Sequence, residues 1–253
     1  MKRIVWSLVL VMFAASLCCA QTVLYFPQFV DGSPGSGFWG SAIAISNPAA
    51  AGTAAAVGNI TVTKFDGTPL NMTFTDDTMA PTSNTFQLGG GQTKIFFSPT
   101  LSGNLQPFVN GFATVTSSAP VTAGLVFLEG NSSFSVISQA GVPAATPLMR
   151  QATVAIRNTA ENTGVAVAYP GNGTANVTYQ LLDKSGTLIV PAVTKTLGAN
   201  NQTAFYITDL FPSVPAQIAG TLRITSDQPI VAVALLIALP QGLLSTIPVF
   251  PVQ

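Results

Sequence analysis

The sequence has no histidine, and both of its cysteines, Cys18 and Cys19, lie among the first 20 residues. The rest of the chain therefore cannot assemble a Ser-His-Asp or Cys-His nucleophile system. The same absences remove the cysteine and histidine ligands that a protein zinc site uses. They also exclude a disulfide within residues 21–253, so any fold there must depend on its own apolar core.

Charge is also scarce, because only 7% of the residues are charged, with nine basic and nine acidic side chains. An average soluble domain has roughly 25% charged residues. Nucleic-acid binding requires clustered lysine and arginine, so we expect no nucleic-acid partner. A surface whose polarity comes from Thr, Ser, Asn, Gln and Gly favours self-association or contact with another uncharged surface. The alternative interpretation is the ordinary composition of a secreted β-protein.

The N-terminal segment has the three parts of a secretory signal. Lys2 and Arg3 form a basic start, residues 4–17 are apolar, and a small-residue site ends at Ala20. We expect residues 1–20 to be a cleaved signal peptide. The mature chain is then secreted, periplasmic or attached to the cell surface.

Two similar stretches dominate the remaining sequence: GFATVTSSAPVTAGLVF at 111–127 and GTLRITSDQPIVAVALL at 220–236. In each, apolar and polar residues first alternate, and an apolar run follows a proline. This pattern predicts a half-buried strand, a short polar turn and a fully buried strand. The run at 230–239 ends at Pro240 and is shorter than the roughly 20 residues of a membrane helix. No transmembrane segment is therefore expected in the mature chain.

Other motifs recur in the same order. NITVTKFDGTPL at 59–70 is matched by NVTYQLLDKSGTL at 176–188, and SAIAISNP at 41–48 by GVAVAYP at 164–170. DLFP at 209–212 is expected to form a single helical turn. Short strands with turn signals every 8–12 residues are typical of β-sandwiches of about 100 residues.

We therefore predict an all-β chain of two tandem immunoglobulin-like antiparallel β-sandwiches after a cleaved signal peptide. The expected boundaries are a signal peptide at 1–20, a first sandwich at 21–140, a linker at 141–150 and a second sandwich at 151–253.

The segments FPQFVDG, FWGSAIAISNP and DLFP, together with the TSxxP strand pair, carry a resemblance. The chain resembles a family of uncharacterised secreted bacterial proteins with tandem immunoglobulin-like β-sandwich domains. The resemblance covers nearly all of the mature chain. It implies the fold and an exported location, and it brings no activity with it.

Aromatic residues supply one candidate binding site. Tyr25, Phe38 and Trp39 could form a platform on which a sugar ring stacks. The alternative is that Trp39 closes the end of a sandwich.

The opening strand supplies a second candidate site, because a strand can add to the sheet edge of a neighbouring molecule. This strand-addition segment contains Thr22, Val23, Leu24, Tyr25 and Phe26. Its alternative is the first strand of its own domain.

Carboxylates could serve in a metal site or in catalysis. Asp31, or the Asp76-Asp77 pair, could contribute to a calcium site, although no DxDxDG spacing is present. Glycosidase chemistry needs two carboxylates that face one cleft. Asp76 and Asp77 are adjacent and would point to opposite sides of a strand. No cofactor is expected, and calcium binding stays open.

The sequence thus predicts a non-catalytic secreted or cell-envelope protein with a structural or adhesive role. One alternative is a carbohydrate-binding module that uses Trp39 and neighbouring aromatic residues. Another is a subunit of an extracellular filament joined by strand addition. The expected partners are polysaccharide, other envelope proteins or a second copy of the chain.

Overall fold

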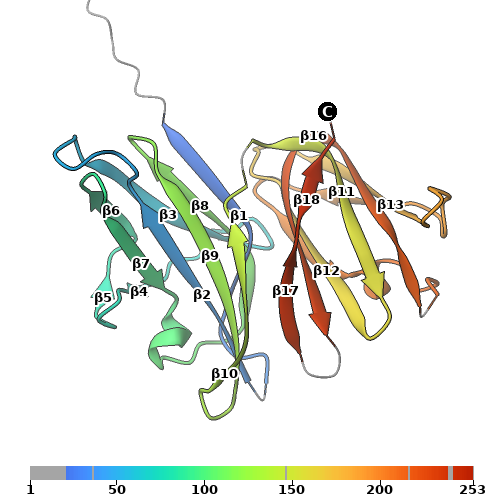
Figure 1. The fold of residues 1–253 in the computed structure, drawn as a ribbon, viewed down its shortest axis with the longest axis horizontal. Helices are drawn as coiled ribbons and strands as arrows, with labels where there is room; N and C mark the ends of the chain where they lie inside the picture. Colours follow the sequence, from blue (N-terminus) through green and yellow to red (C-terminus); the bar gives the residue numbers. More distant parts are fainter. Residues whose placement is uncertain (1–20, 36, 146, 216, 239–241, 253) are drawn as a thin grey trace, which may run out of the picture.

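The computed structural model describes residues 21–35, 37–145, 147–215, 217–238 and 242–252. The expected signal peptide at 1–20 lies outside these residues. The described chain is all-β: its sheets are antiparallel, with one short 3-10 turn and one α-helical turn between strands (Figure 1). None of its described helices has the length and hydrophobicity needed to cross a membrane.

The N-terminal half, residues 22–143, contains two sheets. Sheet 1 has the order β1-β8-β3-β6, and sheet 2 has the order β10-β9-β2-β7-β4-β5. Inward-facing residues such as Phe26, Ile43 and Leu125 are fully buried between them. The strands are β1 (Thr22–Asp31), β2 (Gly37–Ser46), β3 (Ala56–Lys64), β4 (Phe74–Thr75), β5 (Pro81–Thr82), β6 (Thr85–Leu88), β7 (Thr93–Phe97), β8 (Val109–Ser117), β9 (Thr122–Asn131) and β10 (Val136–Pro143), with the 3-10 turn η1 at Pro99–Ser102.

The C-terminal half, residues 149–251, has its own buried cluster around Tyr179, Leu181 and Leu222. Sheet 3 has the order β14-β13-β16-β11-β18, and sheet 4 has the order β15-β12-β16-β17, so β16 belongs to both. The elements are β11 (Met149–Asn158), β12 (Glu161–Ala168), β13 (Ala175–Leu182), β14 (Val193–Leu197), β15 (Gln202–Tyr206), α1 (Ile207–Leu210), β16 (Ile218–Ala238), β17 (Leu243–Ile247) and β18 (Val249–Pro251). The turn α1 confirms the helical turn expected at DLFP.

Strand β16 differs from the strand-turn-strand unit that was predicted for the stretch at 220–236. It runs from Ile218 to Ala238 without a turn, although its pairing register with β11 jumps between Thr225 and Ile230. The first part pairs with β11 and β13, and the second part with β12 and β17. The strand thus passes from sheet 3 to sheet 4 at the polar residues just before Ile230, where its register jumps. Strands that pass from one packed sheet to another do so at a bulge or bend. In the first repeat, β8 and β9 are separate strands that also lie in different sheets.

The second part of β16 is buried on both faces. Ile230, Ala232 and Ala234 point into the core of the C-terminal half, as the predicted fully buried strand requires. Val231 and Val233 lie on the opposite face and are also buried, because that face packs against the N-terminal half. Sheet 4 thereby closes the open side of the N-terminal half, between the edge strands β1 and β10.

The matching strand of the first repeat explains why only one copy is apolar on both faces. The residues of β9 that align with Val231 and Val233 are Thr122 and Gly124. Thr122 is exposed and Gly124 is half-buried, because the outer face of sheet 2 has no such neighbour. The fully buried strand predicted after Pro120 is therefore wrong: β9 is buried on one face only. A change from polar or small residues to valine thus marks the face of sheet 4 that contacts the other half.

Strands overlap both ends of the expected linker at 141–150. Strand β10 continues to Pro143, which pairs with Gly124, and β11 begins at Met149, which pairs with Ile230. Pro143 thus ends β10, and Pro147 lies in the short connection before β11. Sheet pairing extends into the connection from both sides.

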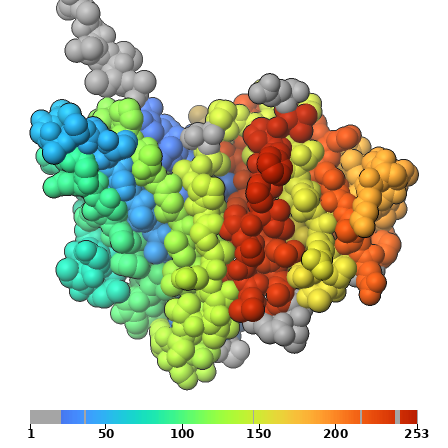
Figure 2. Space-filling view, in the orientation of Figure 1, coloured from blue at the N-terminus to red at the C-terminus, as the bar shows by residue number. Residues whose placement is uncertain are grey.

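Hydrogen bonds also join the two halves. Strand β10 lies beside β17, where Leu244 N donates to Ser138 Oγ at 2.7 Å and the Thr246 hydroxyl donates to the carbonyl oxygen of Gly141. Figure 2 shows the yellow-green atoms of β10 directly against the red atoms of the C-terminal strands. Further along the contact, Gln202 N donates to the carbonyl oxygen of Phe65 at 3.1 Å. The two sheet edges thereby cover one another.

The packing of sheet 4 on the N-terminal half predicts the effect of a single polar substitution. Val231→Thr places a hydroxyl in the contact, so we expect the free energy of unfolding to fall by about 1–3 kcal/mol. The matched control is Val126→Thr on the half-exposed face of β9, where we expect a change within about 0.5 kcal/mol. Urea unfolding of both variants is the measurement. Equal effects at the two positions would contradict burial of the face of sheet 4 that packs against the N-terminal half.

Candidate functional site

A cleft of about 320 Å³ lies where sheet 4 closes incompletely against the N-terminal half. The N-terminal half contributes one wall from β1, β2 and β9. The C-terminal half contributes the other wall from β12, β15, β16 and β17. Residues with side chains that face the cleft include Gln28, Val30, Trp39, Phe127, Ala166, Tyr206, Val233, Leu235, Ile237 and Leu244.

Gly164 keeps the C-terminal wall open. It pairs with both Tyr206 and Leu235, so the three residues share the outer face of sheet 4. A Cβ atom at Gly164 would lie 3.4 Å from Ile237 Cδ1 and 3.7 Å from Tyr206 Cδ1. A methyl group would thus fit there, whereas any longer side chain would enter the cleft.

The charged groups in and near the cleft are acidic. Asp209 lies in its wall beside Tyr206, and Glu129 pairs with Trp39 across β2 and β9 and so shares its face. Burial, and then the negative charges of Glu129 and Asp209, raise the pKa of Tyr206. Burial also raises the pKa of Glu129. Among the residues that the structure describes, no lysine or arginine lines the cleft.

The three aromatic residues proposed as a sugar platform do not come together. Trp39 lines the cleft. Phe38 points to the other face of β2, where it is buried and stacks on Phe134 with ring centroids 5.3 Å apart. Tyr25 packs beside Phe112 in a small cluster between the two halves. Successive residues of a strand face opposite sides, so Phe38 and Trp39 cannot share a platform.

The proposed strand-addition segment is used within its own chain. Thr22, Val23, Leu24, Tyr25 and Phe26 all pair with β8. On the other edge of β1, Ala145 N donates to the carbonyl oxygen of Tyr25 at 2.8 Å. In this structure the segment is therefore the first strand of its own sheet, which was the alternative interpretation.

Sequence reasoning missed Gly164, Tyr206 and Asp209. They come from three different elements, and only the packing of sheet 4 on the N-terminal half places them opposite Trp39. One signal was present: the run after Pro229 is apolar on both faces, whereas its counterpart after Pro120 is not. Such a difference indicates that the second face is covered.

Asp31, one of the proposed calcium ligands, is a buried structural carboxyl that is only 1% exposed. Its Oδ1 atom accepts a hydrogen bond from Thr100 N at 3.2 Å, which ties the end of β1 to η1. Burial raises the pKa of Asp31, and hydrogen bonds from Ser98, Thr100 and Gly32 partly oppose this. The carboxyl is thus surrounded by hydrogen-bond donors rather than by the oxygen ligands that calcium needs.

The remaining prominent carboxylates organise turns. Asp66, Asp76 and Asp183 each accept hydrogen bonds from the backbone and hydroxyl groups of the residue two positions ahead. These side-chain bonds lower the pKa of each carboxyl. Within the described ranges, no three Cys, Asp or Glu side chains gather in a way that could hold a metal ion.

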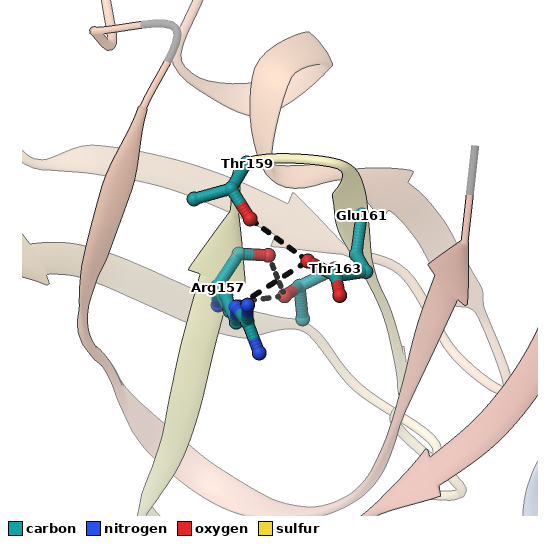
Figure 3. Close-up of polar contacts among 4 residues, drawn as sticks. All are labelled: Arg157, Thr159, Glu161 and Thr163. Carbon is teal, nitrogen blue, oxygen red and sulfur yellow. Dashed lines mark hydrogen bonds and ion pairs between the residues drawn. The ribbon is translucent and has the colours of Figure 1, made fainter. Parts of the chain in front are cut away.

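The polar cluster at the β11–β12 connection has a structural role as well (Figure 3). Arg157 Nε lies 3.4 Å from Glu161 Oε2, which also accepts a hydrogen bond from the Thr159 hydroxyl at 2.8 Å. The Thr163 hydroxyl bonds both the N–H and the carbonyl oxygen of Arg157. The Arg157 side chain is mostly exposed, so this ion pair adds little stability and the cluster shapes the turn.

Comparison with other proteins adds no assignment. A scan against known protein families and a search of curated proteins found no match to this chain. The cleft and the surface chemistry are therefore the basis for a functional proposal.

The buried Asp31 carboxyl predicts a characteristic pH dependence. A raised folded-state pKa gives a contribution to stability that is complete below the unfolded value, about 3.9, and is lost as the pH rises through the folded value. Relative to Asp31→Asn, the free energy of unfolding of the unaltered chain should therefore fall as the pH rises above about 4. Urea unfolding over a pH series measures this difference.

Asp183→Asn is the matched control, because the exposed Asp183 carboxyl has a lowered pKa. Its contribution is present above the unfolded value and is lost as the pH falls through the folded value. The two difference curves should therefore slope in opposite directions. Parallel curves would contradict the different environments of the two carboxyls.

Proposed function

We propose that the protein is an exported, non-catalytic structural or adhesive protein of the cell envelope or the extracellular space. In this proposal residues 1–20 are a signal peptide, and two tandem immunoglobulin-like β-sandwich domains follow, at 21–140 and 151–253. The observation that carries the proposal is the packing of sheet 4 on the N-terminal half, which buries Val231 and Val233. This contact couples the two halves into one stiff body, as a load-bearing or surface-presenting protein requires.

The pairing order supports the duplication. In the N-terminal half the order is β1-β8-β3-β6, and in the C-terminal half it is β11-β16-β13-β14. Likewise β10-β9-β2-β7 corresponds to β17-β16-β12-β15. The arrangement departs from a constant-type immunoglobulin domain, in which the first strand pairs in the sheet of the second. Here β1 pairs with β8 in sheet 1, and β9 pairs with β2 in sheet 2. Relative to the constant-type domain, β1 and β9 have therefore exchanged sheets.

Surface chemistry supports the adhesive role. The tip of the β9–β10 hairpin exposes Phe134, Val136 and Ile137, each close to half accessible. Apolar residues that gather on an exposed surface favour contact with another molecule. The low charge of the whole chain presents little electrostatic repulsion to such a contact.

Export and the absence of catalysis can be tested together. Expressed in a bacterial host, the chain should be recovered outside the cytoplasm with Gln21 as its first residue by mass spectrometry. Leu10→Arg interrupts the apolar stretch and should keep the full-length chain in the cytoplasm. The purified mature protein should show no turnover in a panel of hydrolase and transferase assays. Turnover that one point mutation abolishes would contradict the proposal.

Carbohydrate binding is a second candidate, favoured by the position of Trp39 in the cleft wall. Trp39→Ala should then abolish retention on polysaccharide while the melting temperature stays unchanged. Phe38→Ala is the contrasting variant, because loss of this buried ring should cost about 3–5 kcal/mol of stability. Affinity electrophoresis and thermal melts provide the two readouts. A melting temperature that falls as far for Trp39→Ala would identify Trp39 as a core residue.

A further inference from the structure

We propose that the cleft between the two halves binds a small organic cation with an apolar body. This inference goes beyond the structural role proposed above and does not depend on it. The occupant is a free small molecule, because the cleft is bounded by strands of both halves and its volume is about 320 Å³. Small-molecule sites typically range from about 300 to 1,000 Å³.

The walls select an apolar body. Val233, Leu235 and Ile237 of β16 face Trp39 and Phe127 of the N-terminal half. Burial of apolar ligand surface against such walls gains about 25 cal/mol per Å². A sugar fits less well, because Gln28, Tyr206 and Asp209 are the only polar side chains lining the described cleft. Sugar hydroxyl groups buried there would lack hydrogen-bond partners, which costs binding free energy.

The charges select a cation. Asp209 lies on the C-terminal side of the cleft, and Glu129 shares the face of Trp39 on the N-terminal side. After burial, the negative charges of both carboxylates raise the pKa of Tyr206. A Cβ atom on Gly242 would lie 3.5 Å from Glu129 Oε2, which places this carboxylate where β16 and β17 connect. An ammonium group between these carboxylates would also benefit from the faces of Tyr206 and Trp39.

Trp39 provides a direct readout. The sequence has two tryptophans, Trp6 and Trp39, so the full chain carrying Trp6→Phe reports on the cleft alone. The probes are 4-phenylbutylammonium, the neutral 4-phenylbutanol and the anionic 4-phenylbutanoate, which share one apolar body. We expect the ammonium to change Trp39 fluorescence in a saturable way and to bind at least about tenfold more tightly than the alcohol. Added salt should weaken this preference.

Variants of the cleft separate charge from shape. Asp209→Asn and Glu129→Gln should each weaken binding of the ammonium by about fivefold, the scale of a partly solvated ion pair. Gly164→Leu should block all three probes by filling the cleft, and Gly164→Val is the smaller blocking variant should leucine prevent folding. Asp77→Asn is the control, because it removes the same charge from an exposed loop residue and should leave binding unchanged.

Three outcomes would overturn the proposal. The first is that none of the probes changes Trp39 fluorescence. The second is equal affinity for the ammonium, the alcohol and the carboxylate, which would remove the role of the two acidic residues. The third is binding that survives in Gly164→Leu, or in Asp209→Asn and Glu129→Gln together, because the site would then lie elsewhere.

Discussion

Burial of sheet 4 on both faces is the constraint on which the rest of the structure depends. One face packs Ile230, Ala232 and Ala234 into the core of the C-terminal half, and the other packs Val231 and Val233 against the N-terminal half. Because apolar burial is the largest favourable contribution to folding, this second contact makes each half part of the stability of the other. The N-terminal half would otherwise expose part of its core along its open side.

The cleft follows from the same contact. Closure is complete where Ala168 and Val231 pack against Phe112, and incomplete where Gly164 leaves space between Ile237 and Tyr206. Two surfaces that are each shaped by their own β-pleat seldom fill the whole space between them, and a glycine at the junction enlarges the remaining gap. The residues that line the gap are thus interface residues, which gives the cleft its apolar character.

The polar groups of the molecule fall into two kinds. Asp66, Asp76 and Asp183 are exposed, and their hydrogen bonds fix turns and lower their pKa values. Asp31 and Glu129 lie where burial raises the pKa. Asp31 ties β1 to η1 inside the fold, whereas Glu129 pairs with Trp39, a residue of the cleft wall. The same direction of pKa shift thus occurs at a carboxyl fixed inside the fold and at one that is only partly buried.

Local patterns in the sequence were enough to predict the all-β class, the helical turn near Pro212 and the buried run after Pro229, since periodicity and turn chemistry are local properties. The packing of whole sheets was needed to show that β16 runs through its predicted turn and that Tyr25 lies between the two halves. The cleft was equally beyond sequence reasoning, because its walls come from strands of both halves that do not pair with one another. Which residues meet across two sheets depends on the packing of whole faces, and alternation along one strand specifies a face without specifying its neighbour.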